Sequence, residues 1–199
     1  MQYTPVKEVA LEAGIHVYQP EKVRDEAFLF ELRSICPDVI VVVAFGQILP
    51  KEVLELPEYG CLNVHASLLP KLRGAAPIQW SVIEGDEESG VTIMQMDEGL
   101  DTGDMLMVKK YRLNPRETGG SLFERLAGFG GPMILEVLKQ AEEGRLCPVP
   151  QKEEEHTYAR MLSKETGRID FSRPAEVIER LIRGLNPWPS AFTYLGDKM

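Results

Sequence analysis

Cysteine and histidine are both scarce in this chain of 199 residues, with three of each. Cys36, Cys61 and Cys147 are an odd number at scattered positions and form no CxxC pair. This usage disfavours a disulfide framework and is typical of reduced thiols in an intracellular protein. No histidine is spaced with a second histidine or a cysteine as zinc ligands usually are, so we expect no metal site.

Long apolar runs are also missing. The longest, Val39–Phe45, is far shorter than the roughly 20 residues that cross a bilayer. The N-terminal sequence MQYTPVKEVALEAG lacks the basic start and the apolar stretch of a secretion signal. We therefore expect a soluble, cytoplasmic protein with no membrane partner.

Basic side chains are outnumbered, because Lys and Arg total 22 against 31 Asp and Glu, a formal net charge of -9. An acidic surface repels phosphate, so the chain as a whole is not expected to grip a nucleic-acid backbone unaided. A local basic patch stays compatible with this total. The 44% hydrophobic and 27% charged residues are the balance of a globular protein with a real core.

Periodicity predicts alternating helices and strands. The run CPDVIVVVAFG, bounded by Pro37 and Gly46, is typical of a strand that is buried on both faces. Apolar spacing and turn residues predict helices at 5–13, 20–34, 77–85, 118–143 and 174–185, and strands at 15–18, 39–45, 61–65, 90–97 and 105–113. The sequence GFGG with Pro132 interrupts the long helix, and we expect a kink or close packing there. The alternation predicts an α/β fold with a mainly parallel sheet flanked by helices.

The C-terminal part of the chain changes character. It begins with the polar, loop-like stretch QKEEEHTYARMLSKETG and ends on NPWPSAFTYLG, a turn and the start of a strand. We therefore divide the chain into a domain at 1–150 and, at 151–199, a linker that leads into a second domain.

Polar side chains gather at the predicted strand 61–65, in the segment CLNVHASLLPKLRGAAP. Residues two apart on a strand face the same side, so Asn63, His65 and Ser67 project together. They stand at the carboxyl end of a strand, where open α/β sheets place their ligands. An asparagine amide can stabilise a developing oxyanion, and a histidine titrates near neutral pH. These groups suit the transfer of an acyl group onto an amine.

A carboxylate is the usual partner that holds and charges such an imidazole. Four acids lie in one turn-rich segment after a predicted strand: Asp97, Glu98, Asp101 and Asp104. Glycines at 99 and 103 favour Asp101, because a backbone free to adopt unusual angles can press a side chain into a cleft. The residues alone do not decide which acid reaches His65, and an isolated NxH pair is more often structural than catalytic.

The stretch NVHASLLPKLRGAAPIQWSVIEGDEESGVTIMQMDEGLDTGDML closely resembles the signature region of the 10-formyltetrahydrofolate-dependent formyltransferases. The resemblance runs from TPVKEVALEAG through VVVAFGQILP to GRIDFS and LNPWPSAFTYL, which is nearly the whole chain. Its pattern NxHxSLLPxxRGAAP, with a later DxGxDTG, is highly specific. The resemblance implies a Rossmann-like formyltransferase core that moves the formyl group of 10-formyltetrahydrofolate onto an amine.

The resemblance also assigns roles to individual residues. The family's catalytic asparagine, histidine and aspartate fall on Asn63, His65 and Asp101, which selects Asp101 among the four acids. The family's folate-contacting stretch is Ser67, Leu68, Leu69 and Pro70, and the loop that lines its pterin pocket corresponds to Gln47, Ile48 and Leu49. Ile48 and Leu49 have an alternative as ordinary core residues. The resemblance requires no metal.

Within the family, the NPWP turn favours members whose acceptor is methionyl-initiator tRNA. Lys71 and Arg73 flank the folate stretch and could meet such an anionic substrate, although we expect them to be solvated loop charges. The same site would also serve other amines, those of a nucleotide sugar or of glycinamide ribonucleotide, or hydrolysis of the formyl group. An inactive, folate-binding fragment is a further alternative.

The chain departs from the family's pattern at both ends. Relatives open with a strand, a glycine-containing turn, a helix and a basic loop that helps embrace the tRNA acceptor end, and this sequence starts after most of that loop. It ends near the linker to a C-terminal β-barrel domain that contributes to tRNA binding. We therefore expect an N-terminally incomplete catalytic domain that lacks the first strand–helix unit, with exposed apolar surface at an open sheet edge. We expect the full-length protein to be a monomer.

Overall fold

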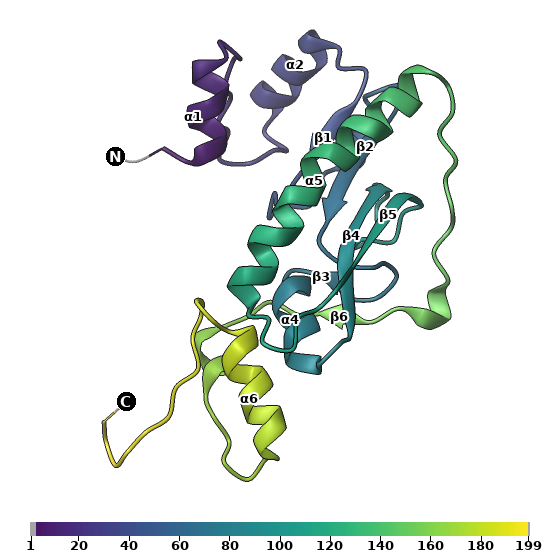
Figure 1. Ribbon diagram of the computed structural model, residues 1–199. Coiled ribbons are helices and arrows are strands. Elements are labelled where there is room, and N and C mark those ends of the chain that lie inside the picture. The colour runs from purple at the N-terminus through teal and green to yellow at the C-terminus, as the bar shows by residue number, and fades with distance from the viewer. Residues whose placement is uncertain (1–2, 199) are drawn as a thin grey trace.

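The computed structural model describes residues 3–198 and has a four-stranded sheet at its centre, in the order β1–β2–β4–β5 (Figure 1). These strands are β1 (Ile40–Val42), β2 (Cys61–His65), β4 (Glu88–Gln95) and β5 (Met105–Arg112). A second, two-stranded sheet pairs β3 (Arg73–Gly74) with β6 (Tyr158–Ala159). The helices are α1 (Pro5–Glu12), α2 (Glu26–Ile35), α3 (Lys51–Leu54), α4 (Pro77–Glu84), α5 (Gly119–Glu142) and α6 (Ala175–Gly184), with short 3-10 turns η1 (Glu153–Glu155) and η2 (Lys164–Gly167).

The α/β class predicted from the sequence is confirmed, and the sheet is mixed. β1 and β2 pair in parallel, with Ile40 opposite Cys61. β4 runs antiparallel to β2, and β5 runs antiparallel to β4. The connection 96–104 is shorter than the crossover of about a dozen residues that a parallel pair requires, so β4 and β5 form a hairpin. The expectation of parallel strands holds for β1 and β2 and is corrected for this hairpin.

Helices α4 and α5 cover one face of the sheet, and Figure 1 shows α5 running across it. The buried residues of this layer are Leu62, Val82, Val91, Ile93, Leu122, Leu126, Met133 and Val137. Gly130 lets α5 approach β2 closely, because a Cβ there would lie 3.1 Å from Cγ1 of Val64. Neighbours on a strand alternate in direction, so Leu62 and Val64 face the helices while Asn63 and His65 face the opposite side.

A second cluster of buried residues lies around β1. It contains Val23, Leu29, Val42, Leu49, Val53, Leu54 and Cys61. The expectation of a strand buried on both faces is wrong for β1, because Val41 and Val43 are 40% and 60% exposed. β1 is an edge strand of the described sheet, so no neighbouring strand lies beyond it. This apolar, open edge agrees with the expectation from the sequence.

Most of the predicted elements are confirmed within a few residues at their ends, but the helix expected at 20–34 begins only at Glu26. The segment 15–18 is an exception, since it belongs to none of the strands within residues 3–198, and the rings of His16 and Tyr18 pack on each other instead, with centroids 4.4 Å apart. The long helix α5 continues through Pro132 without interruption. The close packing expected at this GFGG sequence is present at Gly130.

The C-terminal part of the chain packs against the part before it. β6 pairs in parallel with β3, and α6 lies against α4, below the main sheet in Figure 1. Leu185 at the end of α6 is buried with Ala76 and Leu162. The strand expected at the C-terminus is reduced to isolated bridges, of which one pairs Arg168 with Phe192. The division of the chain at residue 150 stays a prediction.

Two glycines of α5 are expected to respond in opposite directions to replacement by alanine. Gly128→Ala should stabilise the protein by about 0.5–1 kcal/mol, because no atom lies within 4 Å of the added Cβ and alanine favours the helix. Gly119→Ala should destabilise it by about 1–3 kcal/mol, because its Cβ would lie 2.3 Å from the carbonyl oxygen of Gly184. Urea unfolding midpoints at unchanged m-value would measure both changes. A loss of stability in Gly128→Ala would contradict a regular, open helix face there.

Candidate active site

Strand β2 carries two polar side chains to the face of the sheet that lies away from α5. Asn63 stands opposite Met94 and His65 opposite Thr92 in the antiparallel ladder with β4. His65 is only 5% exposed. On this face the end of β2 is bordered by the segments 67–74 and 97–104, which bond directly to its side chains.

The carboxylate of Asp101 connects these groups. Its Oδ1 accepts a hydrogen bond from Nδ2 of Asn63 at 3.3 Å, and its Oδ2 accepts one from the backbone N–H of Gly74 at 2.7 Å. Oδ2 also lies 3.7 Å from Nδ1 of His65, which is an ion-pair distance and too long for a hydrogen bond. The asparagine, histidine and aspartate singled out from the sequence are therefore brought together by the structure.

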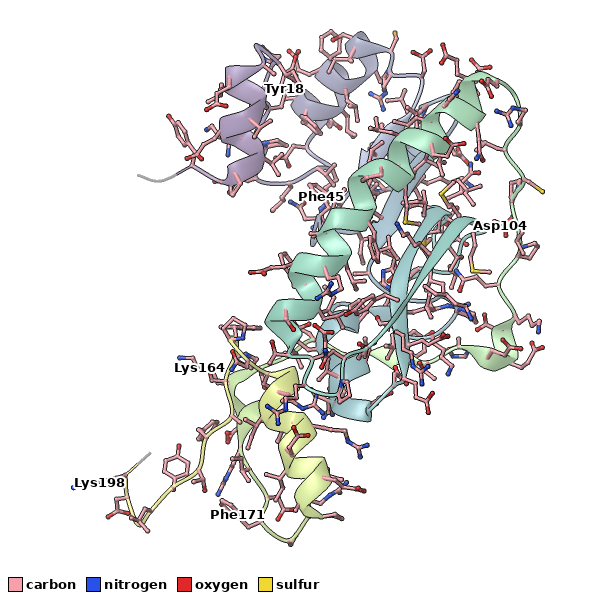
Figure 2. All side chains as sticks on the ribbon, in the orientation of Figure 1. Tyr18, Phe45, Asp104, Lys164, Phe171 and Lys198 are labelled. Carbon is pink, nitrogen blue, oxygen red and sulfur yellow. The ribbon has the colours of Figure 1, made fainter. Side chains whose placement is uncertain are left out.

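Of the four acids in the turn between β4 and β5, Asp101 is the one in ion-pair contact with His65. Asp97 accepts hydrogen bonds within its own turn, from a backbone N–H and a threonine hydroxyl. Glu98 pairs with a lysine of α3 at 3.3 Å. Asp104, labelled in Figure 2, stands directly before β5. The choice that the residues alone left open is thus made by the course of the turn.

The backbone of this turn is held in an unusual conformation. Asp101 has a φ of 55°, in the left-handed region, which costs a residue with a Cβ about 1–2 kcal/mol. Gly103 allows the turn to pass β4, because a Cβ at this position would lie 1.8 Å from the carbonyl oxygen of Gln95. Strain of this kind persists only where surrounding contacts hold it in place.

A backbone contact sets the proton position of the neutral His65 ring. Its Nε2 lies 2.9 Å from the carbonyl oxygen of Leu72, which can only accept a hydrogen bond. Nε2 therefore carries the proton, and Nδ1 of the neutral ring presents a lone pair toward Asp101. When the ring gains a second proton, Nδ1–H faces the carboxylate, and the two form an ion pair.

The stretch Ser67–Pro70 lies directly after this histidine and is fixed by β4. The Thr92 hydroxyl donates to the carbonyl oxygen of Ser67 at 2.7 Å and accepts from the backbone N–H of Leu69 at 3.2 Å. The side chains of Ser67 and Leu69 are buried, whereas those of Leu68 and Pro70 are partly exposed. The Leu69–Pro70 peptide is cis. The structure therefore places the whole predicted folate stretch beside the cluster, and its role in folate binding stays a prediction.

The segment predicted to line the pterin pocket divides between core and surface. Leu49 is 7% exposed and belongs to the cluster around β1, while Ile48 is 89% exposed. The side chain of Gln47 accepts from the backbone N–H of Val23 and donates to the carbonyl oxygen of Glu21, so it ties two loops together. Phe45, labelled in Figure 2, lies just before this segment. The chain leaves β1 here, beside the end of its parallel neighbour β2.

The expectation of a solvated charge at position 73 is wrong. Arg73 is 1% exposed, and its guanidinium donates to Oε1 of Gln151 and to Oε2 of Glu153, each at 3.0 Å. A buried guanidinium needs such partners, and Gln151 lies 78 residues further along the chain. Sequence reasoning missed Gln151 because its surroundings are those of a polar loop.

The described residues hold three free cysteines, of which Cys36 and Cys147 are exposed and Cys61 is buried. Within residues 3–198, no three side chains of His, Cys, Asp or Glu are grouped so that they could hold a metal ion. None of the helices in this range combines the length and the apolar character that a membrane span needs.

The fold is α/β, and the polar cluster brings together an amide, an imidazole and a carboxylate, groups that suit the transfer of an acyl group. The chain belongs to the formyl transferase family: the model described as Formyl transferase matches residues 1–138, and the model described as Formyl transferase, C-terminal domain, matches residues 161–199. It is 59% identical to the methionyl-tRNA formyltransferase of Lachnospira eligens over 99% of this chain, and 60% identical to that of Agathobacter rectalis over 100%. The chain spans 62% and 64% of the lengths of these two curated relatives.

Several solved structures share the fold of this chain. A sugar N-formyltransferase from Shewanella sp. matches with a TM-score of 0.80 at 20% identity, over 98% of this chain and 78% of that one. HypX from Aquifex aeolicus, in complex with tetrahydrofolic acid, matches with a TM-score of 0.70 at 23% identity, over 85% of this chain and 28% of that one. These likenesses confirm the α/β fold.

The thiol of Cys61 is expected to resist alkylation in the folded protein. Burial on β2 raises the pKa of this thiol to about 11, so the reactive thiolate is scarce at neutral pH. Treatment with iodoacetamide at pH 8 should modify Cys36 and Cys147 and leave Cys61 unmodified, as measured by peptide mass spectrometry. Modification of all three after unfolding in urea is the control. Rapid labelling of Cys61 in the folded protein would contradict the buried position of β2.

Proposed function

We propose that this protein transfers the formyl group of 10-formyltetrahydrofolate to the amino group of methionyl-initiator tRNA. The observation that carries the proposal is the carboxylate of Asp101, which lies 3.3 Å from Asn63 and 3.7 Å from His65 at the end of β2. The family membership supports formyl transfer as the reaction. The names of relatives at 59% and 60% identity support methionyl-tRNA as the acceptor.

In the proposed reaction Asn63 stabilises negative charge. The amine of the acceptor attacks the formyl carbon, and the electron pair of the carbonyl bond moves onto its oxygen. One N–H of the Asn63 amide donates to Asp101, and its second N–H donates to this oxygen. Because Asn63 is held from one side by the carboxylate, the donor is oriented before the charge develops.

His65 and Asp101 are proposed to move the protons. Asp101 accepts the proton that the attacking amine loses, directly or through a water. His65, charged beside Asp101, stabilises the oxyanion and gives its Nδ1 proton to the folate nitrogen as the bond from this nitrogen to the formyl carbon breaks. Return of the proton from Asp101 to Nδ1 restores the starting state, and it passes through a water because the 3.7 Å separation is too long for a direct hydrogen bond. No metal takes part in these steps.

We propose the backbone of Ser67–Pro70 and the segment 47–49 as the folate contacts. The first is supported by its position beside His65, and the second by its departure from β1 next to the end of β2. Since Leu49 is in the core, its contribution would come from its backbone. We further propose a cytoplasmic protein whose catalytic domain covers residues 1–150, with 151–199 leading into a second domain, and a monomer at full length.

A sugar amine is the second acceptor to test, because sugar N-formyltransferases share the fold at TM-scores of 0.74 to 0.80. Their identity to this chain is 20%, so the likeness concerns the fold. Incubation with initiator methionyl-tRNA, a nucleotide amino sugar or glycinamide ribonucleotide in parallel would separate the acceptors. Formate release without any acceptor would indicate hydrolysis, and folate binding without turnover would indicate a binding fragment.

Replacement of Asn63 by alanine tests the proposed chemistry. Asn63→Ala should lower kcat by about 10²–10³, because one oxyanion donor is removed. Binding of the folate should persist, since its contacts are assigned to backbone groups elsewhere. Formyl-methionine formation from 10-formyltetrahydrofolate and initiator methionyl-tRNA measures turnover, and fluorescence titration with the folate measures binding.

Gln140→Ala is the matched control, because it removes an amide on α5 whose side chain donates to Glu136. It should turn over at the rate of the unmodified protein. Near-normal turnover of Asn63→Ala would refute its assigned role. Absence of product from the unmodified, folded protein with every acceptor would refute the proposed function.

A further inference from the structure

We infer that Gln151 is a positioning residue that holds the Asp101 turn in its active geometry, an inference that rests on the function proposed above. Gln151 itself lies outside the cluster of Asn63, His65 and Asp101. It acts on the backbone of the turn and not on a reacting group. Its connection to the site is made through two hydrogen bonds on one side and a buried guanidinium on the other.

The amide nitrogen of Gln151 donates hydrogen bonds to the turn at two places. Its Nε2 donates to the carbonyl oxygen of Asp101 at 2.8 Å and to the carbonyl oxygen of Gly103 at 2.8 Å. Both N–H groups of the amide are therefore used. The two acceptors belong to Asp101, whose φ is 55°, and to Gly103, which passes close to β4.

The amide oxygen fixes the orientation of the same side chain. Oε1 of Gln151 accepts from Nε of Arg73 at 3.0 Å. A guanidinium only donates and a backbone carbonyl only accepts, so the amide satisfies its partners in one orientation and not in the flipped one. Arg73 is 1% exposed, and its Nη1 bonds Glu153 at 3.0 Å. The amide of Gln151 is therefore held in one orientation by a buried guanidinium that has its own partner in Glu153.

Arg73 lies in β3, and the two residues beside it bond to the side chains of His65 and Asp101. They are Leu72, whose carbonyl oxygen binds Nε2 of His65, and Gly74, whose N–H binds Oδ2 of Asp101. β3 is itself fixed by β6, because the backbone N–H of Arg73 donates to the carbonyl oxygen of Thr157 at 2.9 Å. Gln151 thus couples the position of the turn to the strand that orients the histidine.

The turn that carries Asp101 needs the two hydrogen bonds from Gln151, because its own sequence does not hold it in this conformation. Gly99 and Gly103 flank Asp101, and the left-handed conformation of Asp101 is unfavourable by itself. A displacement of about 1 Å at a reacting group can lower a rate on the order of 10²-fold. Loss of the two bonds from Gln151 should therefore affect turnover more than binding.

Gln151→Glu tests the inference with a side chain of nearly the same shape. The glutamate keeps an acceptor for Arg73 but replaces the donor to both carbonyl oxygens with an acceptor, so the two bonds to the turn are lost. We expect kcat for formyl transfer to fall about 10- to 100-fold, with a KM for 10-formyltetrahydrofolate within about 3-fold of the unmodified protein. Glu154→Gln, an exposed neighbour, is the control and should leave both constants unchanged.

A double-mutant cycle separates positioning from general destabilisation. If Gln151 acts through Asp101, then Gln151→Glu should lower turnover several-fold less in an Asp101→Asn background than in the unmodified protein. An equal loss in both backgrounds, or an unchanged kcat in the single variant, would overturn the inference. Urea unfolding of Gln151→Glu checks that the protein measured is folded.

Amide hydrogen exchange keeps the inference separate from the proposed function. Should the unmodified protein transfer no formyl group, the proposed function fails, yet the two hydrogen bonds from Gln151 still predict a measurable change. The N–H of Gly74, which binds the Asp101 carboxylate, should exchange at least about 10-fold faster in Gln151→Glu, while that of Leu126 in α5 stays unchanged. Equal protection of Gly74 in both proteins would overturn the inference.

Discussion

The carboxylate of Asp101 is the group on which the arrangement of the site depends. Its two oxygens bind the side chain of Asn63 on β2 and the backbone of Gly74 on β3, and they lie in ion-pair range of His65. Three segments of the chain, at residues 63, 74 and 101, are thereby joined at one charged group. Hydrogen bonds to a charged group are roughly twice as strong as neutral ones, so this single side chain can hold the three segments together.

The rest of the fold leaves the end of β2 free for this cluster on one face of the sheet. α4 and α5 bury the side of β2 that carries Leu62 and Val64, and close packing at Gly130 brings α5 onto it. On the opposite side, Cys61 at the start of β2 packs in the cluster around β1, and the end of β2 is bordered by loops. These loops supply backbone donors and acceptors where a helix would supply apolar side chains. Polar groups buried there find partners, as the hydroxyl of Thr92 does with the stretch Ser67–Pro70.

Local sequence predicted the elements whose signal is local. The helix α5 and the strand β2 follow from apolar spacing over a few turns or residues, and β2 is found at the predicted bounds Cys61–His65. The segment 15–18 has a strand-like composition, yet a strand also needs a partner in hydrogen-bonding distance. The direction of β4 relative to β2, and the exposure of Val41 and Val43, depend in the same way on what lies beside them.

Residue patterns alone predicted the α/β class, the pair Asn63 and His65 on one face of a strand, and a short list of acids that could join them. The tertiary structure decided that Asp101 is the acid in contact, because the turn after β4 places its carboxylate against β2 and β3. It also decided that Arg73 is buried and bound to Gln151 rather than solvated. Spacing along a strand fixes which side chains share a face, whereas contacts between distant segments depend on packing that no short stretch of sequence encodes.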